Sequence, residues 1–202
     1  MAVKYYAVRK GRVPGIYTTW KECKKQVHRF SGAVFKSFST YAEAEDFIAD
    51  DGFKLSEDID IENAVTAYVD GSYNPETGVY GYGVILFDGD VKHGLSNAFH
   101  DPAKSSMRNV AGEIEGAMCA MQYCYDLDRD KSVLVLYYDY TGIEMWCTGA
   151  WKTKKKWTQE YKAFYDKISE KVTVVFRKVR GHSGNRYNEE ADLLAKEAVG
   201  AL

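Results

Sequence analysis

Blocks of apolar residues run through positions 64–202 and together predict an α/β domain. Five blocks have the apolar or alternating pattern of strands, and they cover AVTAYVD (64–70), YGYGVILF (80–87), VKHGLSNAF (91–99), SVLVLYYD (132–139) and VTVVFRKV (172–179). Apolar positions at helical spacing predict helices over about 109–125, from about 140, over about 158–170 and from about 189. We therefore expect a mixed five-stranded sheet with flanking helices.

The order of these blocks predicts which strands are neighbours. Short turns join the first three, which is typical of an antiparallel meander. The strand over 132–139 follows a helix, so a right-handed crossover should place it parallel to the strand over 64–70. Asp70 and Asp139 would then end adjacent strands, at the edge where open α/β sheets bind ligands.

Residues 1–48 show a separate pattern of short elements. Two strands separated by GRVPG, a helix, a third strand and a second helix give the order ββαβα. Thr19 with Glu22 and Thr40 with Glu43 have the spacing of capping boxes that begin the two helices. The acid-rich stretch 49–63 lacks a sustained apolar period, so we interpret it as a linker to a second domain over 64–202.

Charge separates the two parts more sharply than the overall net charge of −2 suggests. Residues 1–41 carry nine basic side chains and one acidic side chain, a net charge of +8, and the remaining 18 basic and 28 acidic residues give −10. A basic domain can hold a polyanion, and an acidic one can hold cations. The cysteines form no C-x-x-C pair, and no signal peptide or apolar span of membrane length is visible. We expect a reduced, cytoplasmic, monomeric protein without a membrane partner.

Aromatic residues in the basic domain suggest how it could hold nucleic acid. Tyr6, Trp20 and Phe35 can present ring faces to sugars or bases while Lys36 neutralises phosphate. Aromatic residues in so small a domain are more often part of the core, and lysines usually lie in solvent. Both interpretations remain open at this point.

Four carboxylates in the second domain stand where a strand ends or a helix begins: Asp70, Glu113, Asp139 and Asp192. Carboxylates that converge on one pocket repel one another, so they either take up protons or share a cation. An oxygen-only ligand set favours Mg²⁺, with Mn²⁺ as an alternative. Each acid also has an ordinary explanation, as a turn residue, a helix cap, a solvated helix residue or a partner of the helix dipole.

Residues 64–202 resemble type 1 ribonuclease H nearly end to end. The resemblance is carried by AYVDGSY, YGYGVIL, NVAGE, YYDYTGIE and GHSGNRYNEEADLLA, the last with the family's His-x-Gly segment and closing Asn-Glu-x-x-Asp helix. Residues 4–48, with YYAVRKGRVPGIYTTW and FKSF, resemble the hybrid-binding domain that precedes many such enzymes and occurs in plant-virus viroplasmins.

The resemblance implies an endonuclease that hydrolyses the RNA strand of RNA/DNA hybrids and leaves 5′-phosphate and 3′-hydroxyl ends. Asp70, Glu113, Asp139 and Asp192 would be ligands of two Mg²⁺ ions, and His182 would move protons or speed product release. Asn109 and Asn74 would sense 2′-hydroxyls in the minor groove. Tyr6, Trp20 and Phe35 would contact the DNA strand, and Lys36 the backbone.

The chain departs from the family pattern at four places. The turn that carries Asn74 is shorter than in common relatives. Thr141 stands where some relatives carry Gln, Ser37 replaces a second Lys, and the basic protrusion is reduced to AWKTKKKW. Two other functions are weighed against the nuclease: a non-catalytic binding protein like the viroplasmins, and a related fold for strand transfer or junction cutting. The presence of all four acids disfavours the first, and the YVDGSY and GHSGNRYNEEAD segments are the wrong pattern for the second.

Overall fold

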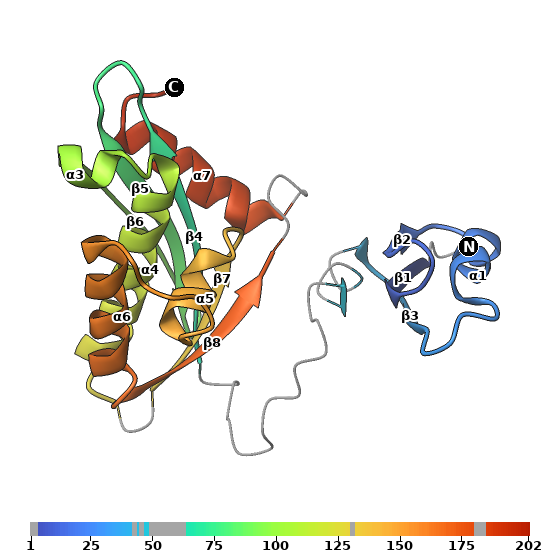
Figure 1. Ribbon diagram of the computed structural model, residues 1–202. Coiled ribbons are helices and arrows are strands. Elements are labelled where there is room, and N and C mark those ends of the chain that lie inside the picture. Colours follow the sequence, from blue (N-terminus) through green and yellow to red (C-terminus); the bar gives the residue numbers. More distant parts are fainter. Residues whose placement is uncertain (1–3, 42–43, 45–46, 49–63, 130–131, 180–184) are drawn as a thin grey trace. The chain divides into compact units, whose positions relative to one another are not determined.

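The chain divides into two compact units in the computed structural model, the first ending at Glu57 and the second beginning at Asp58 (Figure 1). The structure describes residues 4–41, 44, 47–48, 64–129, 132–179 and 185–202. The predicted linker 49–63 lies outside these residues, so its ends stay a prediction.

The first unit is built on a three-stranded antiparallel sheet with a helix packed against it. Strands β1 (Tyr5–Lys10), β2 (Gly15–Tyr17) and β3 (Val34–Phe38) pair in the order β2-β1-β3, and α1 (Trp20–Val27) packs on β1. Its small core is formed by Val8, Cys23 and Val27, with partly buried neighbours around them.

The N-cap half of the first predicted capping box is present, with Thr19 as the N-cap of α1, whereas the Glu22 carboxylate bonds the Thr19 hydroxyl rather than its backbone amide. The Thr19 hydroxyl accepts a hydrogen bond from the Glu22 amide and donates one to the Glu22 carboxylate. The first four elements therefore follow the predicted order. Most of the second predicted helix, including Glu43, lies outside the described residues.

The second unit is built on a mixed five-stranded sheet in the order β6-β5-β4-β7-β8. The antiparallel meander contains β4 (Val65–Tyr73), β5 (Tyr80–Asp88) and β6 (Val91–Phe99). Strands β7 (Ser132–Tyr138) and β8 (Val172–Lys178) continue the sheet in parallel to β4. The meander and the parallel pairing of β4 with β7 are confirmed.

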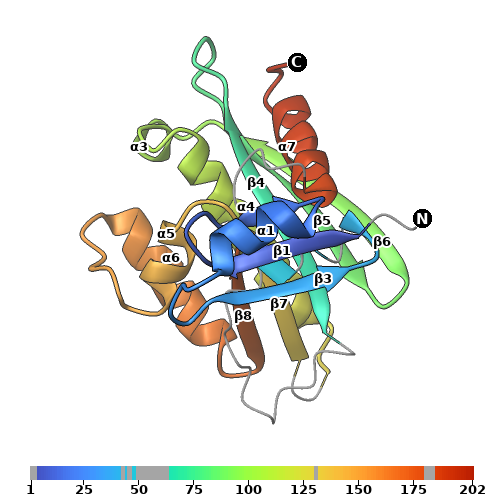
Figure 2. The ribbon, with the colours of Figure 1, turned by 90° about the vertical axis from the view of Figure 1, so that its right-hand side faces the viewer.

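Helices cover both faces of this sheet. They are α3 (Pro102–Ser105), α4 (Asn109–Asp126), α5 (Gly142–Cys147), α6 (Lys156–Ile168) and α7 (Arg186–Ala198). Gly71 of β4 faces α4, whereas Gly83 of β5 faces α7. Because Gly71 lies one position beyond Asp70, the register partner of Gly83, the two glycines point to opposite faces. Figures 1 and 2 show α7 alone on one side and α4 with α6 on the other.

The main core lies between the sheet and α4, α5 and α6. Its fully buried side chains include Leu86, Ile114, Met121, Leu134 and Tyr161. The predicted helix over 109–125 is therefore correct in both its extent and its apolar face. Among the described residues, no helix is long and apolar enough to cross a membrane.

Candidate metal centre

Asp70 and Asp139 are brought together by the pairing of two parallel strands. Tyr68 of β4 is the register partner of Tyr137 of β7, so residues two positions further along each strand are level with each other. Those residues are Asp70, inside β4, and Asp139, directly after β7 ends at Tyr138. The expectation that these two acids lie level on adjacent strands is therefore confirmed, but Asp70 does not end its strand, because β4 continues to Tyr73 through its pairing with β5.

Glu113 joins them because α4 lies unusually close to β4. A Cβ atom on Gly71 would stand 2.2 Å from the Asn109 carbonyl oxygen and 2.4 Å from the Glu113 amide nitrogen. A Cβ atom on Gly112 would stand 1.9 Å from the carbonyl oxygen of Gly81. These separations exclude any side chain, so Gly71 and Gly112 allow backbone contact that places Glu113 beside Asp70.

The three carboxylates form a compact group. One carboxylate oxygen from each of Asp70, Glu113 and Asp139 lies within 4.8 Å of the other two. Asp70 is 8% exposed and Glu113 only 2% exposed, while Asp139 is half-buried. Three acids so close together, and so poorly solvated, cannot all ionise without a compensating positive charge.

The protonation of this group reflects burial and repulsion. Burial, and secondly the charge of Asp139, raises the pKa of Asp70 to about 7. Burial, followed by the charges of Asp139 and Asp70, raises the pKa of Glu113 to about 9. Two neighbouring carboxyl groups are thus poised to release protons when a cation binds.

Asn188 supports Asp70 from α7, a contact that sequence analysis did not assign. Its side-chain amide donates to one Asp70 carboxylate oxygen at 3.4 Å, and the Gly71 amide donates to the other at 2.7 Å. Asn185 caps the helix by accepting from the Tyr187 and Asn188 amides. The Asn-Glu-x-x-Asp motif contained Asn188, but the pattern alone could not show which atom it would reach.

Asp192, the fourth predicted ligand, lies near the group but not within it. Its carboxylate pairs with Lys196 at 2.6 Å, one turn further along α7, and its charge still acts on Asp70. The helix is held close to the sheet at Gly83, where a Cβ atom would stand 2.0 Å from the Ala191 carbonyl oxygen. A ligand role for Asp192 stays a prediction.

The two predicted minor-groove asparagines have different surroundings. Asn109 is exposed at the start of α4, and its amide donates to Glu113 at 3.4 Å. Asn74 is buried: its amide donates to the carbonyl oxygens of Val199 and Gly200, and its oxygen accepts from the Glu76 and Thr77 amides. These bonds make Asn74 an anchor for the turn after β4, and contact of either residue with substrate stays a prediction.

The three predicted aromatic residues of the first unit form a continuous surface cluster. The ring centroids of Tyr6 and Trp20 lie 5.7 Å apart, and those of Trp20 and Phe35 lie 5.8 Å apart. Trp20 is 44% exposed and Phe35 is 42% exposed. Lys36 is exposed on the same strand as Phe35. The structure therefore favours the surface alternative over the core alternative for Trp20 and Phe35.

His182, the predicted proton carrier, lies outside the described residues.

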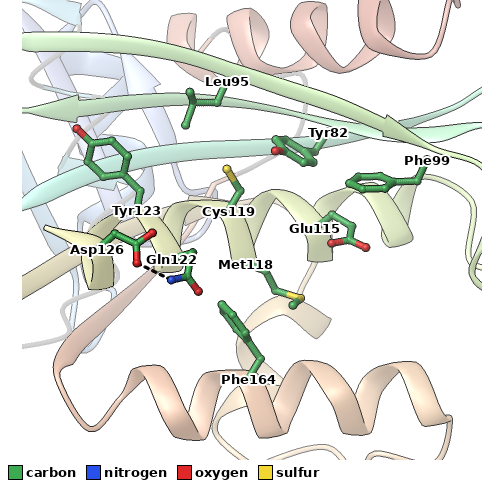
Figure 3. Close-up of a pocket in the computed structure, with 10 residues that line it drawn as sticks. All are labelled: Tyr82, Leu95, Phe99, Glu115, Met118, Cys119, Gln122, Tyr123, Asp126 and Phe164. Carbon is green, nitrogen blue, oxygen red and sulfur yellow. Dashed lines mark hydrogen bonds between the residues drawn. The ribbon is translucent and has the colours of Figure 1, made fainter. Parts of the chain in front are cut away.

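A hollow of about 430 Å³ lies apart from the acids, between the sheet, α4 and α6 (Figure 3). Glu115 of α4 lines this hollow and lies two positions after Glu113, and two steps along a helix turn the side-chain direction by about 200°. Cys119 and Gln122 lie on the same helix face as Glu115, so these side chains point away from Glu113. None of the predicted site residues lines this hollow.

Both units match known protein families. Residues 4–48 match the family described as the Ribonuclease H1 N-terminal domain, and residues 62–200 match the RNase H family. Ribonuclease H of Chlorobium limicola is 33% identical over 144 residues, which cover 69% of this chain and 97% of that protein. Ribonuclease H of Chlorobium phaeovibrioides is 34% identical with the same coverage.

Solved structures show the same fold. RNase H1 from the archaeon Halobacterium salinarum aligns with a TM-score of 0.56 at 22% identity, over 69% of this chain and 99% of that one. LC11-RNase H1, solved in complex with RNA/DNA hybrid, aligns with a TM-score of 0.52 at 22% identity, over 67% and 96%. With the family matched over residues 62–200 and the carboxylates gathered at the strand ends, the chain belongs to the ribonuclease H family.

Proposed function

We propose that this protein is an endonuclease that hydrolyses the RNA strand of RNA/DNA hybrids with two divalent ions, leaving 5′-phosphate and 3′-hydroxyl ends. The observation that carries the proposal is the convergence of Asp70, Glu113 and Asp139 at the carboxyl ends of two adjacent parallel strands. The chain's membership of the ribonuclease H family supports the reaction class. The complex of LC11-RNase H1 with RNA/DNA hybrid supports the choice of substrate.

The chemistry of the donor set fits magnesium. The group offers only carboxylate oxygens, which hard divalent cations prefer, with no cysteine or histidine among the three. The raised pKa values of Asp70 and Glu113 show that burial and mutual repulsion disfavour their ionised forms. A bound cation would stabilise these ionised forms. Ions held there would activate a water molecule and stabilise the departing 3′ oxygen.

The chain's own residues prepare the site for this step. Asn188 and the Gly71 amide hold both oxygens of Asp70, which fixes the direction of that carboxylate. Lys196 pairs with Asp192 one turn along the same helix, and a bound cation would have to share the Asp192 carboxylate with it. We assign Asp192 to the ion-binding set on its charge and position, and His182 to proton movement on the sequence pattern alone.

Recognition of the hybrid is assigned to two surfaces. Asn109 is exposed next to Glu113, where it can contact a 2′-hydroxyl of the strand being cut. The Tyr6, Trp20 and Phe35 cluster offers ring faces for sugars or bases, and Lys36 offers a charge for phosphate. The first unit is thus proposed to bind the hybrid, and the second unit to cut it and to sense the 2′-hydroxyl through Asn109.

A cleavage assay tests the proposal directly. Labelled RNA/DNA, RNA/RNA and DNA/DNA duplexes are incubated with the protein and Mg²⁺, with and without EDTA. We expect cutting only in the RNA strand of the hybrid, products with 5′-phosphate ends, and complete loss of cutting in EDTA.

Asp139→Asn should abolish turnover, whereas His182→Ala should slow it and leave residual activity.

Asp166→Asn is the matched control for Asp139→Asn. Asp166 is an exposed acid of α6 that pairs with Lys162, so its neutralisation should leave cleavage unchanged. Full cutting by Asp139→Asn, or cutting that survives EDTA, would overturn the metal assignment. Binding of the hybrid without any cleavage would favour the non-catalytic, viroplasmin-like alternative.

A further inference from the structure

Lys178 brings a positive charge to the edge of the sheet that carries the acids, and the function derived above gives it no role. It is the last residue of β8, and its register partner on β7 is Tyr138, the residue directly before Asp139. Neighbouring strands lie about 4.8 Å apart and successive residues about 3.3 Å, so the Cα atoms of Lys178 and Asp139 are about 6 Å apart. The Val179 amide donates to the Tyr138 carbonyl oxygen at 2.8 Å, which extends the pairing past Lys178 and fixes its backbone.

Thr141 holds the ammonium group of Lys178. The ammonium donates a hydrogen bond to the Thr141 hydroxyl, and Thr141 stands two residues after Asp139, directly before α5. Lys178 is exposed, and an ammonium has three donors, so this contact leaves donors that face solvent. Thr141 is also a position where the chain departs from the family pattern, and its contact with Lys178 gives that departure a structural role.

No carboxylate of the described residues pairs with Lys178, although three acids lie at this edge of the sheet. Register partners point to the same face of a sheet, and on that face the Tyr138 hydroxyl donates to Glu144 of α5. Asp70 points to the other face, where Asn188 of α7 donates to it. Lys178 therefore lies beside the acids without filling the space between them, which stays available to cations.

A positive charge at this position is suited to a phosphate group of the strand held at the acids. Lysine binds phosphate as a point charge on a flexible stem. Phosphates of one strand follow each other at about 3.4 Å along the helix axis, so a neighbour of the phosphate at the acids comes within reach of Lys178. Lys196 is less suited to this contact, because it already pairs with Asp192.

We propose that Lys178 is a substrate-binding residue that holds a phosphate of the RNA strand next to the one being cut. The proposal rests on the proposed function, because it takes the hybrid as the ligand. Thr141 is a positioning residue that acts through the Lys178 ammonium. The contact is the same before and during the reaction, so it raises affinity and leaves the chemical step unchanged.

Binding of the hybrid to Lys178→Met tests the proposal, because methionine is unbranched like lysine and carries no charge. The measurement uses the full chain with Asp70→Asn as background, in Mg²⁺, at a series of salt concentrations. We expect affinity to fall about tenfold and the salt slope to decrease by about one. In the chain with Asp70 intact, KM should rise by a similar factor while kcat changes less than about twofold.

Lys171→Met is the matched control. Lys171 is exposed and stands directly before the other end of β8, where it pairs with Asp128. Its substitution should change neither affinity nor salt slope. Lys178→Arg should keep the salt slope, since it keeps the charge. Both Lys178 variants should unfold at the temperature of the unmodified chain, because the side chain is exposed.

Thr141→Val tests the positioning role. Valine keeps the branched shape of threonine and removes the hydroxyl, so we expect affinity to fall about threefold with the salt slope unchanged. In a chain that already carries Lys178→Met, the same substitution should have no further effect. Full additivity of the two substitutions would show that Thr141 does not act through Lys178 and would overturn the positioning role.

Uncharged linkages locate the phosphate. A single methylphosphonate linkage is moved along each strand of a short hybrid whose cleavage position has been mapped. In the RNA strand beside that position, it should weaken binding to the chain with Lys178 intact and remove the difference between that chain and Lys178→Met. The same result from a linkage in the DNA strand would overturn the assignment to the cut strand.

The outcomes separate this contact from the proposed function. If Lys178→Met binds the hybrid with the affinity and salt slope of Lys171→Met, the contact is refuted even when cleavage is normal. If the unmodified chain cuts none of the duplexes, the proposed function fails, and the binding data still decide whether Lys178 contacts phosphate.

Discussion

Burial gives Asp70 and Glu113 a protonation behaviour that surface carboxylates lack. Their pKa values rise from 3.8 to about 7 and from 4.5 to about 9. The folded chain without metal thus binds protons that the unfolded chain has already released across this range. Until a cation binds, ionisation of these neighbouring acids lowers the free energy of unfolding.

The metal-free protein should therefore lose stability as pH rises. Both folded pKa values are raised, so the two groups stabilise the fold below about pH 4, and this contribution declines as pH rises towards 9. The slope is at most about 1.4 kcal/mol per pH unit for each group. Denaturant unfolding in EDTA at a series of pH values measures it.

Neutral replacements provide the control for this pH dependence. Asp70→Asn with Glu113→Gln removes both titrating groups, so the difference in stability between the two proteins should diminish as the pH is lowered. Saturating Mg²⁺ should also flatten the slope in the unmodified chain. An identical pH dependence in the double variant would contradict the assignment of the raised pKa values to these acids.

Individual residues were predictable to different degrees. Asp70 and Asp139 could be placed from strand pattern and topology, because register follows once β4 and β7 are known to be neighbours. The contact of Asn188 with Asp70 depends on how α7 sits on the sheet, and the positive φ of Arg108 is an unfavourable conformation for a residue with a side chain. Neither follows from local sequence preference.

At the scale of elements, backbone contact between strand and helix sets the geometry of the site. Gly71 and Gly112 let β4, β5 and α4 approach more closely than any side chain would allow. The apolar periods predicted the five strands of the second unit and its longer helices, but not α3, and they placed the start of α7 three residues too late. They did not predict these contacts, because a glycine in a strand or helix has several explanations until its neighbours are known.

Gly112→Ala should disturb the site and the fold together. Its Cβ would stand 1.9 Å from a backbone oxygen of β5, and backbone cannot yield as a flexible side chain can. We expect a loss of about 1–3 kcal/mol in the free energy of unfolding, with weaker Mg²⁺ binding as α4 moves outward. Denaturant unfolding and a metal titration measure the two effects.

Gly149→Ala separates this crowding from a general effect of replacing glycine. Gly149 has a φ of 76° and nothing within 4 Å of its added Cβ, so its substitution tests backbone strain without crowding. It should cost some stability but leave Mg²⁺ affinity unchanged. Equal loss of metal affinity in both variants would argue against the contact between α4 and β5 as the cause.

At the scale of the whole molecule, the two units have opposite charge. The basic first unit is proposed to bind the hybrid, and the acidic second unit to cut it. The charge division near residue 41 predicted this arrangement, and family matches now cover both parts. Sequence alone left the aromatic residues of the first unit open between core and surface. The exposure of Trp20 and Phe35 favours the surface because a domain with so few core side chains cannot bury every ring.

Substitutions in the first unit should weaken binding without changing the chemistry. We expect Trp20→Ala to reduce hybrid affinity by about 1–3 kcal/mol with the salt slope unchanged, because ring stacking is uncharged. Lys36→Ala should instead lower the salt slope by about one. The kcat at saturating hybrid should stay the same in both, and a fall in kcat would place these residues in the cutting step.

The wide separation of Asp70, Glu113 and Asp139 along the chain has a consequence for kinetics. Their oxygens meet only after β4 pairs with β7 and α4 docks against both, so the ion site belongs to the finished fold. A ligand that recognises only the native state leaves early folding events untouched. Magnesium should therefore prolong the lifetime of the folded enzyme rather than hasten its formation.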